Sequence, residues 1–368
     1  MTVVLRGLTW DHPRGYRPLE VFSHPEVSVE WDRQPLSGFE STPLVELAAQ
    51  YDLLVIDHPG LGAAVETGAV LPVEDVFSPD DLASWKSQAL APTWSSYQLE
   101  GHGWALPLDA ATQACVYRAD RISTPPQDWS DVLLLSEEAG HRGRGGVVLC
   151  VAGPHAGLML LGLAGDRSGG TGRLLDKGRA IAALELLRRV WRRSDQSAAE
   201  LDPIGVHELL AADEAVCCPL VYSYASYGHT LTWAAAPRLF TQDGVGNGTL
   251  GGTGLAVTPR AYSKVLAVTK YVRGLLDVRT QLDVVSAVGG QSATAAVWES
   301  AAVDRAWGGH YSATLETVRT SYVRPRFDGW IGFQDELSER VRELLGNDDD
   351  LSAAVDRIED DYRKVRHG

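Results

Sequence analysis

Basic residues are scarce in this sequence, and that scarcity limits the partners it can have. Its 368 residues contain 33 lysines and arginines against 48 aspartates and glutamates, a formal net charge of -15 at pH 7. Nucleic acids and anionic membranes are bound by basic clusters that neutralise phosphates. The densest basic segment, residues 188–193, follows an apolar helical stretch, where cations complement the negative end of a helix. We therefore expect no nucleic-acid partner.

Cysteine is also rare, and its spacing excludes the common metal and redox motifs. Cys115, Cys150, Cys217 and Cys218 fit no zinc or redox pattern, and the adjacent pair cannot easily bridge to itself. We expect four buried free thiols. No metal and no cofactor are predicted. The glycine-rich residues 244–254 lack both a following Gly-Lys-Ser/Thr and the dinucleotide-binding spacing, so a turn or hinge explains them better.

Long apolar segments are missing as well. The most apolar window, residues 147–165, is interrupted by Pro154 and His155, so no membrane-spanning segment is predicted. The first seven residues lack a charged region, a long apolar core and a small-residue cleavage site. The sequence therefore predicts no export signal. The expected location is the cytoplasm if Met1 is the native start, and the periplasm or cell exterior if a signal has been removed.

Apolar runs alternate with helix-forming stretches through the first 110 residues. Such alternation indicates βαβ units and a parallel sheet, and therefore an α/β fold. The length suits two domains, at about 150 residues per domain. In this first region the sequence predicts strands at 3–8, 27–31 and 53–57 and helices at 15–22, 41–50 and 61–68.

A second α/β region follows, and helices fill most of the chain after residue 259. The last helix begins near three aspartates, 348–350, and repeats apolar residues at helical spacing, so one of its faces should be buried. In the second region the sequence predicts strands at 114–118, 131–135, 147–151 and 215–222 and helices at 154–164, 176–194 and 204–212.

The tripeptide Asp-His-Pro occurs twice, at 11–13 and 57–59, each time directly after an apolar run that predicts a strand. In open α/β sheets, ligands bind outside the carboxyl ends of the strands. Both turns should therefore face the same crevice. The alternative is that Asp and Pro serve here as ordinary turn and helix-entry residues.

Three stretches together resemble the bacterial extracellular solute-binding proteins, which are the substrate-binding proteins of ABC importers. They are Gly-Trp-Ala-Leu-Pro-Leu-Asp at 103–109 with Tyr117 eight residues later, Gly-Gly-Thr-Gly-Leu-Ala-Val at 251–257, and Tyr-Val-Arg-Pro-Arg-Phe at 322–327 with Trp330. The nearest familiar shape is the maltose-binding type. The order and spacing of the three stretches cover most of the chain.

This resemblance implies a two-lobed, type II periplasmic-binding-protein-like α/β fold with the ligand cleft between the lobes. Lobe one would comprise 1–110 plus 250–303, and lobe two 111–249 plus 304–368. The implied function is capture of a small polar organic solute, a sugar or a hydroxylated or carboxylated metabolite, for an ABC transporter permease. We expect a monomer without membrane insertion.

The candidate ligand-binding residues combine aromatic faces with carboxylates and imidazoles, which suits a polar organic solute. An arginine at position 14 could hold a carboxylate with two hydrogen bonds, and a histidine at position 155 opens a predicted helix, whose start favours anions. Trp330 is included because the resemblance implies an aromatic there. The full set is Trp10, Asp11, His12, Arg14, Asp57, His58, Asp109, His155, Tyr222, Tyr224 and Trp330.

An enzyme on the same scaffold is the alternative. An exported binding protein should begin with a signal, which is not seen here, and function resides in sites rather than in folds. His12 and His58 could serve as general acid and base of a lyase or isomerase of an organic acid, each oriented by its neighbour, Asp11 or Asp57. The sequence shows no nucleophile motif. Both hypotheses remain open at this point.

Overall fold

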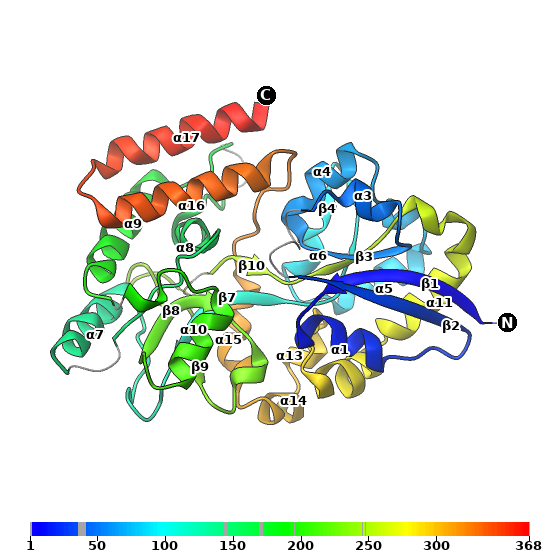
Figure 1. Ribbon diagram of the computed structural model, residues 1–368, viewed down its shortest axis with the longest axis horizontal. Coiled ribbons are helices and arrows are strands. Elements are labelled where there is room, and N and C mark those ends of the chain that lie inside the picture. Colours follow the sequence, from blue (N-terminus) through cyan, green and yellow to red (C-terminus); the bar gives the residue numbers. More distant parts are fainter. Residues whose placement is uncertain are drawn as a thin grey trace. The chain divides into compact units, whose positions relative to one another are not determined.

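The chain forms two compact units, each assembled from three separate segments (Figure 1). The computed structural model describes residues 2–35, 42–142, 146–168, 172–194, 196–244, 246 and 248–367. Unit 1 comprises Met1–Ala110, Gly251–Asp304 and Arg324–Ile331, and unit 2 comprises Ala111–Leu250, Arg305–Val323 and Gly332–Gly368. The sequence-based division gave residues 324–331 to the second lobe, whereas they pack with unit 1.

Unit 1 is built on a five-stranded sheet in the order β2-β1-β3-β11-β6. β1 is parallel to both β2 and β3, while β11 runs antiparallel to β3 and β6. The predicted parallel pairing is thus confirmed for β1, β2 and β3, whereas the sheet as a whole is mixed; β1 and β3 are direct neighbours. The bounds are β1 (Val3–Trp10), β2 (Val27–Gln34), β3 (Leu53–Ile56), β6 (Leu106–Pro107) and β11 (Gly254–Val257).

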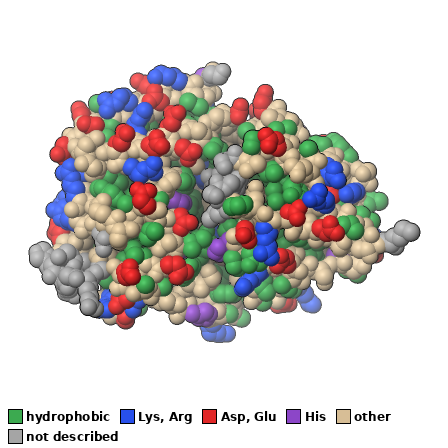
Figure 2. All heavy atoms as spheres, in the orientation of Figure 1, with side chains coloured by type: hydrophobic (Ala, Val, Ile, Leu, Met, Phe, Trp, Pro, Cys, Tyr) green, Lys and Arg blue, Asp and Glu red, His purple; other side chains and the backbone are tan. Residues whose placement is uncertain are grey.

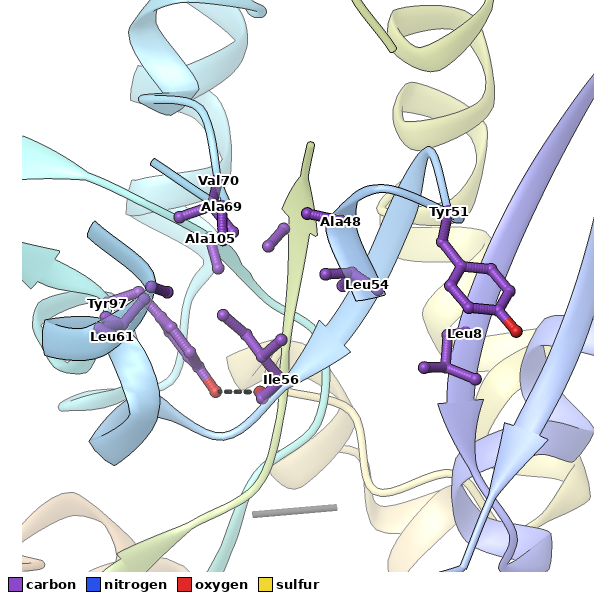
Figure 3. Packing of buried hydrophobic residues seen from close by; sticks show 12 residues of the cluster. Leu8, Ala48, Tyr51, Leu54, Ile56, Leu61, Ala69, Val70, Tyr97 and Ala105 are labelled. Carbon is purple, nitrogen blue, oxygen red and sulfur yellow. Dashed lines mark hydrogen bonds between the residues drawn. The ribbon is translucent and has the colours of Figure 1, made fainter. Parts of the chain in front are cut away.

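The core of unit 1 forms where the apolar face of this sheet meets the helices that follow its strands (Figure 3). Leu8 of β1 and Leu54 and Ile56 of β3 are buried in one cluster with Leu61 and Tyr97. The Tyr97 hydroxyl donates to the Ile56 carbonyl at 3.4 Å. The helices of unit 1 include α1 (Pro13–Val21), α3 (Leu44–Ala48), α4 (Leu61–Glu66), α5 (Pro79–Gln88), α6 (Thr93–Ser96), α11 (Val265–Leu275), α12 (Val278–Thr280) and α13 (Ala295–Trp298).

Unit 2 contains a four-stranded sheet in which β7 pairs antiparallel with both β8 and β9. The strands are β7 (Ala111–Tyr117), β8 (Cys217–Tyr222), β9 (Thr232–Ala234) and β10 (Leu250–Gly251). Its helices include α7 (Trp129–Arg142), α8 (His155–Ala164), α9 (Lys177–Trp191), α10 (Pro203–Ala211), α15 (His310–Arg319) and α17 (Leu351–His367), together with α16 (Trp330–Gly346) from Gly332 onward. α17 buries one face, as its spacing predicts.

Two of the predicted strands in this region are wrong or incomplete. Residues 131–135 lie within α7, because the Asp128 carboxylate accepts hydrogen bonds from the backbone of Ser130 and Asp131 and starts a helix. Val132 is buried while Leu134 is 57% exposed, as a helix turning past the core requires. Residues 147–151 are buried, but they join the sheet only through a single bridge from Val147 to Cys217.

All four cysteines are free and buried, as predicted. On the face of the molecule shown in Figure 2, acidic and basic side chains are interspersed. Every helix within the described ranges is too short or too polar to cross a bilayer.

Candidate functional site

The two Asp-His-Pro turns lie at the ends of adjacent parallel strands in unit 1. β1 ends at Trp10 and β3 ends at Ile56, and the two strands pair at Leu8 and Leu54. Their carboxyl ends therefore meet at one edge of the sheet, as the sequence predicts. Each turn then enters a helical segment, but the side chains of the two turns are used differently.

In the second turn, Asp57 is bound by two neighbours. Its Oδ2 accepts a hydrogen bond from Arg324 Nη2 at 2.6 Å, and its Oδ1 lies 3.1 Å from His58 Nδ1 and accepts from the His58 backbone at 2.7 Å. The Arg324 and Asp57 side chains are 1% and 12% exposed. Burial acts to raise the pKa of Asp57, but the Arg324 charge and the His58 contacts outweigh it and hold that pKa well below its usual value. The carboxylate is therefore charged at neutral pH.

His58 is buried next to this carboxylate, with 1% of its surface exposed. Burial lowers the pKa of His58 to about 4, against the opposing effect of Asp57. The imidazole is then neutral at pH 7, with Nδ1 positioned to donate to Asp57. Nε2 is buried and has no hydrogen-bond partner among the described residues. The ring also makes an edge contact with Tyr97, at 6.2 Å between centroids.

Arg324 has no role predicted from the sequence, although it belongs to the Arg-Pro motif. The chain brings it to Asp57 because the segment Arg324–Ile331 packs against the start of α4. A Cβ added at Gly62 would come within 2.2 Å of the backbone of Phe327. Only glycine allows that approach. Gly62 therefore lets the segment that carries Arg324 pack closely against α4, near Asp57.

In the first turn, the side chains form a stacked group. His12 caps α1 by accepting at Nδ1 from the Arg14 backbone at 3.2 Å, and its ring stacks on Trp10 at 5.1 Å between centroids. Gly15 lies against the indole of Trp10, where an added Cβ would come within 2.3 Å. Asp11 is exposed and pairs with Arg33 at 3.5 Å. Asp57 thus lies beside its own histidine, whereas Asp11 pairs with an arginine of β2.

Arg14 and Asp109, both predicted as ligand contacts, are paired with each other in unit 1. Arg14 Nε donates to Asp109 Oδ2 at 2.8 Å, and Nη2 donates to Oδ1. Both side chains are buried, at 6% and 9% exposure. In this bidentate geometry each buried charge, the Arg14 guanidinium and the Asp109 carboxylate, is neutralised by the other.

The predicted residues of unit 2 divide into a partly exposed pair and a buried tyrosine. His155 is the first residue of α8 and contacts the ring of Tyr222 at 5.8 Å between centroids, and both are partly exposed. The Tyr222 hydroxyl lies 3.1 Å from that of Thr249. Tyr224 is 6% exposed and packs edge-on against His207 at 5.6 Å.

Trp330 is fully buried in the structure. It begins α16 and makes an edge contact with Phe327, at 5.9 Å between centroids. Of the eleven predicted residues, those that remain exposed or partly exposed are Asp11, His12, Asp57, His155 and Tyr222, and those that are buried are Trp10, Arg14, His58, Asp109, Tyr224 and Trp330. Their contact with a ligand stays a prediction.

The exposed and partly exposed members offer carboxylate and imidazole groups in unit 1 and an imidazole and a phenol in unit 2. Groups of these types can exchange hydrogen bonds with hydroxyl or amide groups. No group of three or more His, Cys, Asp or Glu side chains that could hold a metal ion occurs among the residues described.

The chain is similar in fold to several solved structures along its whole length. It matches the cyclic alpha-maltosyl-1,6-maltose binding protein of Arthrobacter globiformis with a TM-score of 0.80 and 14% identity, over 100% of both chains. It matches an ABC transporter solute-binding protein from Thermotoga lettingae, bound with alpha-D-tagatose, with a TM-score of 0.78 and 15% identity, over 99% of this chain and 100% of that one. The predicted α/β fold of the two-lobed solute-binding proteins is confirmed.

In sequence, no family model matches the chain. A stretch of 116 residues is 25% identical to the maltotriose-binding protein of Pyrococcus abyssi. That match covers 31% of this chain and 24% of the length of the relative.

Proposed function

We propose that this protein is a solute-binding protein that captures a small polar organic solute for an ABC importer. The observation that carries the proposal is the fold match over 100% of this chain and of a protein named for the maltose-based sugar that it binds. The solute class is a sugar, a polyol or a hydroxylated carboxylate. Exposed or partly exposed hydrogen-bonding groups at the sheet edge of unit 1 and at the start of α8 support that class.

The proposed ligand contacts come from both units. In unit 1 they are Asp11, His12 and Asp57, and in unit 2 they are His155 and Tyr222. The proposed mechanism is that of the fold class, in which lobes close around the solute. A permease partner and a monomeric state in solution belong to the same proposal.

The enzyme alternative gains no support from the geometry of its second histidine. His58 is 1% exposed, and with a pKa of about 4 its imidazole is neutral at pH 7 and lacks the imidazolium proton that a general acid would transfer. A general acid or base must lie within hydrogen-bond reach of the substrate.

A thermal-shift screen of the purified chain tests the proposal. Maltotriose, maltose, tagatose and ribitol represent sugars and polyols, and a set of hydroxy acids represents the carboxylates. A solute that binds only the folded chain raises the melting temperature in proportion to the logarithm of its concentration above Kd. Each hit is then measured by calorimetry, and the recovered solute is analysed by mass spectrometry. No shift with any member of the two classes, or recovery of an altered solute, contradicts the proposal.

Variants then connect binding to the named residues. Asp11→Asn, His12→Ala and His155→Ala each remove an exposed or partly exposed candidate group, and we expect each to weaken binding at least about tenfold where the group hydrogen-bonds the solute. Glu66→Gln, an exposed carboxylate at the end of α4, is the matched control and should leave affinity unchanged.

A further inference from the structure

A small cavity lies in unit 1 beside the points where the chain leaves this unit and re-enters it. The chain passes to unit 2 after Ala110 and returns at Gly251. The cavity has a volume of about 20 Å³, and Arg14, Asp109 and Thr253 contribute to its lining. The rest of the lining is mostly apolar, with Leu19 of α1 and Leu275 of α11 among it, and it also includes Gln291.

The two segments that cross at this point are bonded to each other. Asp109 N donates to the Thr253 carbonyl at 3.0 Å, and Thr253 N donates back to the Asp109 carbonyl at 3.1 Å. Gly252, between them, has a φ of +107°, and an added Cβ would lie 2.2 Å from the Asp109 carbonyl oxygen. The crossing segments are therefore closely packed at their backbones, and the cavity borders their side chains.

Thr253, which lines this cavity, has an unsatisfied polar atom. The residue is 5% exposed, and its Oγ1 is buried with no hydrogen-bond partner among the described residues. A buried hydroxyl that makes no hydrogen bond is unfavourable, so such groups usually meet protein or ordered water. Asp109 has capacity on the other side, since a carboxylate offers about four acceptor positions and Arg14 Nε and Nη2 donate to two of them.

We propose that one water molecule occupies this cavity and joins Thr253 Oγ1 to the Arg14–Asp109 ion pair. The volume suffices, because a water requires about 10–15 Å³ measured in the same way and two to four polar partners. The water donates to a carboxylate oxygen of Asp109 and exchanges a second hydrogen bond with the threonine hydroxyl. Arg14 and Asp109 then hold both crossing segments to the start of α1. The inference goes beyond the proposed function and does not depend on it.

A high-resolution crystal structure of the full chain tests the site directly. The expected result is one ordered water within hydrogen-bond distance of Thr253 Oγ1 and of an Asp109 carboxylate oxygen. An empty cavity, or a threonine hydroxyl bonded directly to a protein atom, would overturn the proposal.

Hydrogen exchange on two matched variants supplies a solution test. Thr253→Val keeps the shape but removes the hydroxyl, and we expect the amides of Asp109 and Thr253 to exchange about fivefold faster, as the loss of one net hydrogen bond implies. Thr253→Ser keeps the hydroxyl and should exchange like the original chain. Unchanged exchange in the valine variant, or equal acceleration in both variants, would overturn the bridging role. The serine variant and the crystal structure decide the matter even if the valine variant folds poorly.

Discussion

Asp57 Oδ2 lies 2.6 Å from Nη2 of Arg324, a residue 267 positions further along the chain. The guanidinium side chain is 1% exposed and the carboxylate side chain 12%. The pair connects the end of β3 to Arg324–Ile331, the third segment of unit 1. A buried ion pair adds little net stability over an apolar pair of the same shape, but removal of one partner leaves an uncompensated buried charge.

Replacement of Asp57 by asparagine should therefore strongly destabilise the protein. The amide side chain would keep the shape, but the Arg324 charge would lose its partner, and we expect the free energy of unfolding to fall by about 3 kcal/mol. Urea unfolding followed by tryptophan fluorescence measures the change. Glu26→Gln is the matched control, because Glu26 pairs with Lys270 at the surface of unit 1 and both are more than half exposed. Equal effects of the two substitutions would show that the ion pair of Asp57 and Arg324 is no more important to stability than a surface pair.

The close approach at Gly62 predicts a second sensitive position. An alanine methyl group there would overlap the backbone of Phe327, at 2.2 Å, and backbone cannot rotate away as a side chain can. We expect Gly62→Ala to lower the free energy of unfolding by about 2 kcal/mol. Gly60→Ala is the control two residues earlier, where the nearest atom to an added Cβ is a Leu44 methyl at 3.8 Å, an ordinary contact. Thermal unfolding of both variants should show a loss for Gly62→Ala alone.

The strand ends were predictable because their signal is local. An apolar run followed by Asp-His-Pro predicts where β1 and β3 end, and their parallel pairing follows from the alternation of strands and helices. The partner of Asp57 was not predictable, because its distance in sequence leaves no pattern that connects the two. The burial of His58, Arg14 and Asp109 depends on the same long-range packing, which the local sequence pattern does not reveal.

Helix α7 shows a different limit. Its apolar residues 132–135 are consecutive, and a run of four is consistent with either a strand or a helix. The deciding residue is Asp128, whose carboxylate caps the helix from outside the run. The predicted strand at 147–151 shows the same ambiguity. A buried apolar segment need not pair along its length, and this one forms only the bridge at Val147.

The buried thiols predict low cysteine reactivity in the folded protein. Burial raises the pKa of Cys150, and a hydrogen bond with Cys115, together with burial, raises the pKa of Cys217. The thiolate is the reactive form of cysteine. A raised pKa keeps the thiol protonated and burial blocks access of a reagent, so both disfavour modification. At pH 8 we expect a thiol reagent such as dithionitrobenzoate to label none of the four cysteines in the native chain and all four in denaturant. Rapid labelling of any cysteine under native conditions would contradict the packing of unit 2.

His207 of α10 is enclosed by aromatic rings in unit 2. Tyr227 stacks on it at 4.8 Å between centroids, and Trp233 lies at 5.3 Å. Neither imidazole nitrogen has a hydrogen-bond partner among the described residues, and the side chain is fully buried. Burial lowers the pKa of His207 to about 3 from the ordinary 6.5.

This difference predicts a loss of stability in acid that His207→Phe should reduce. The folded chain holds the ring neutral while the unfolded chain protonates it near pH 6.5, so the His207 contribution is complete above that pH and is lost progressively as the pH falls towards 3. Between pH 7 and pH 5 the loss from this residue is about 2 kcal/mol. We expect the fall in the free energy of unfolding over that interval to be smaller in the phenylalanine variant by this amount, whatever the variant does to stability at pH 7. His229→Phe, at an exposed position of the same unit, is the control, and its pH dependence should match that of the original chain. Parallel curves for all three proteins would show that His207 is hydrated or paired in solution.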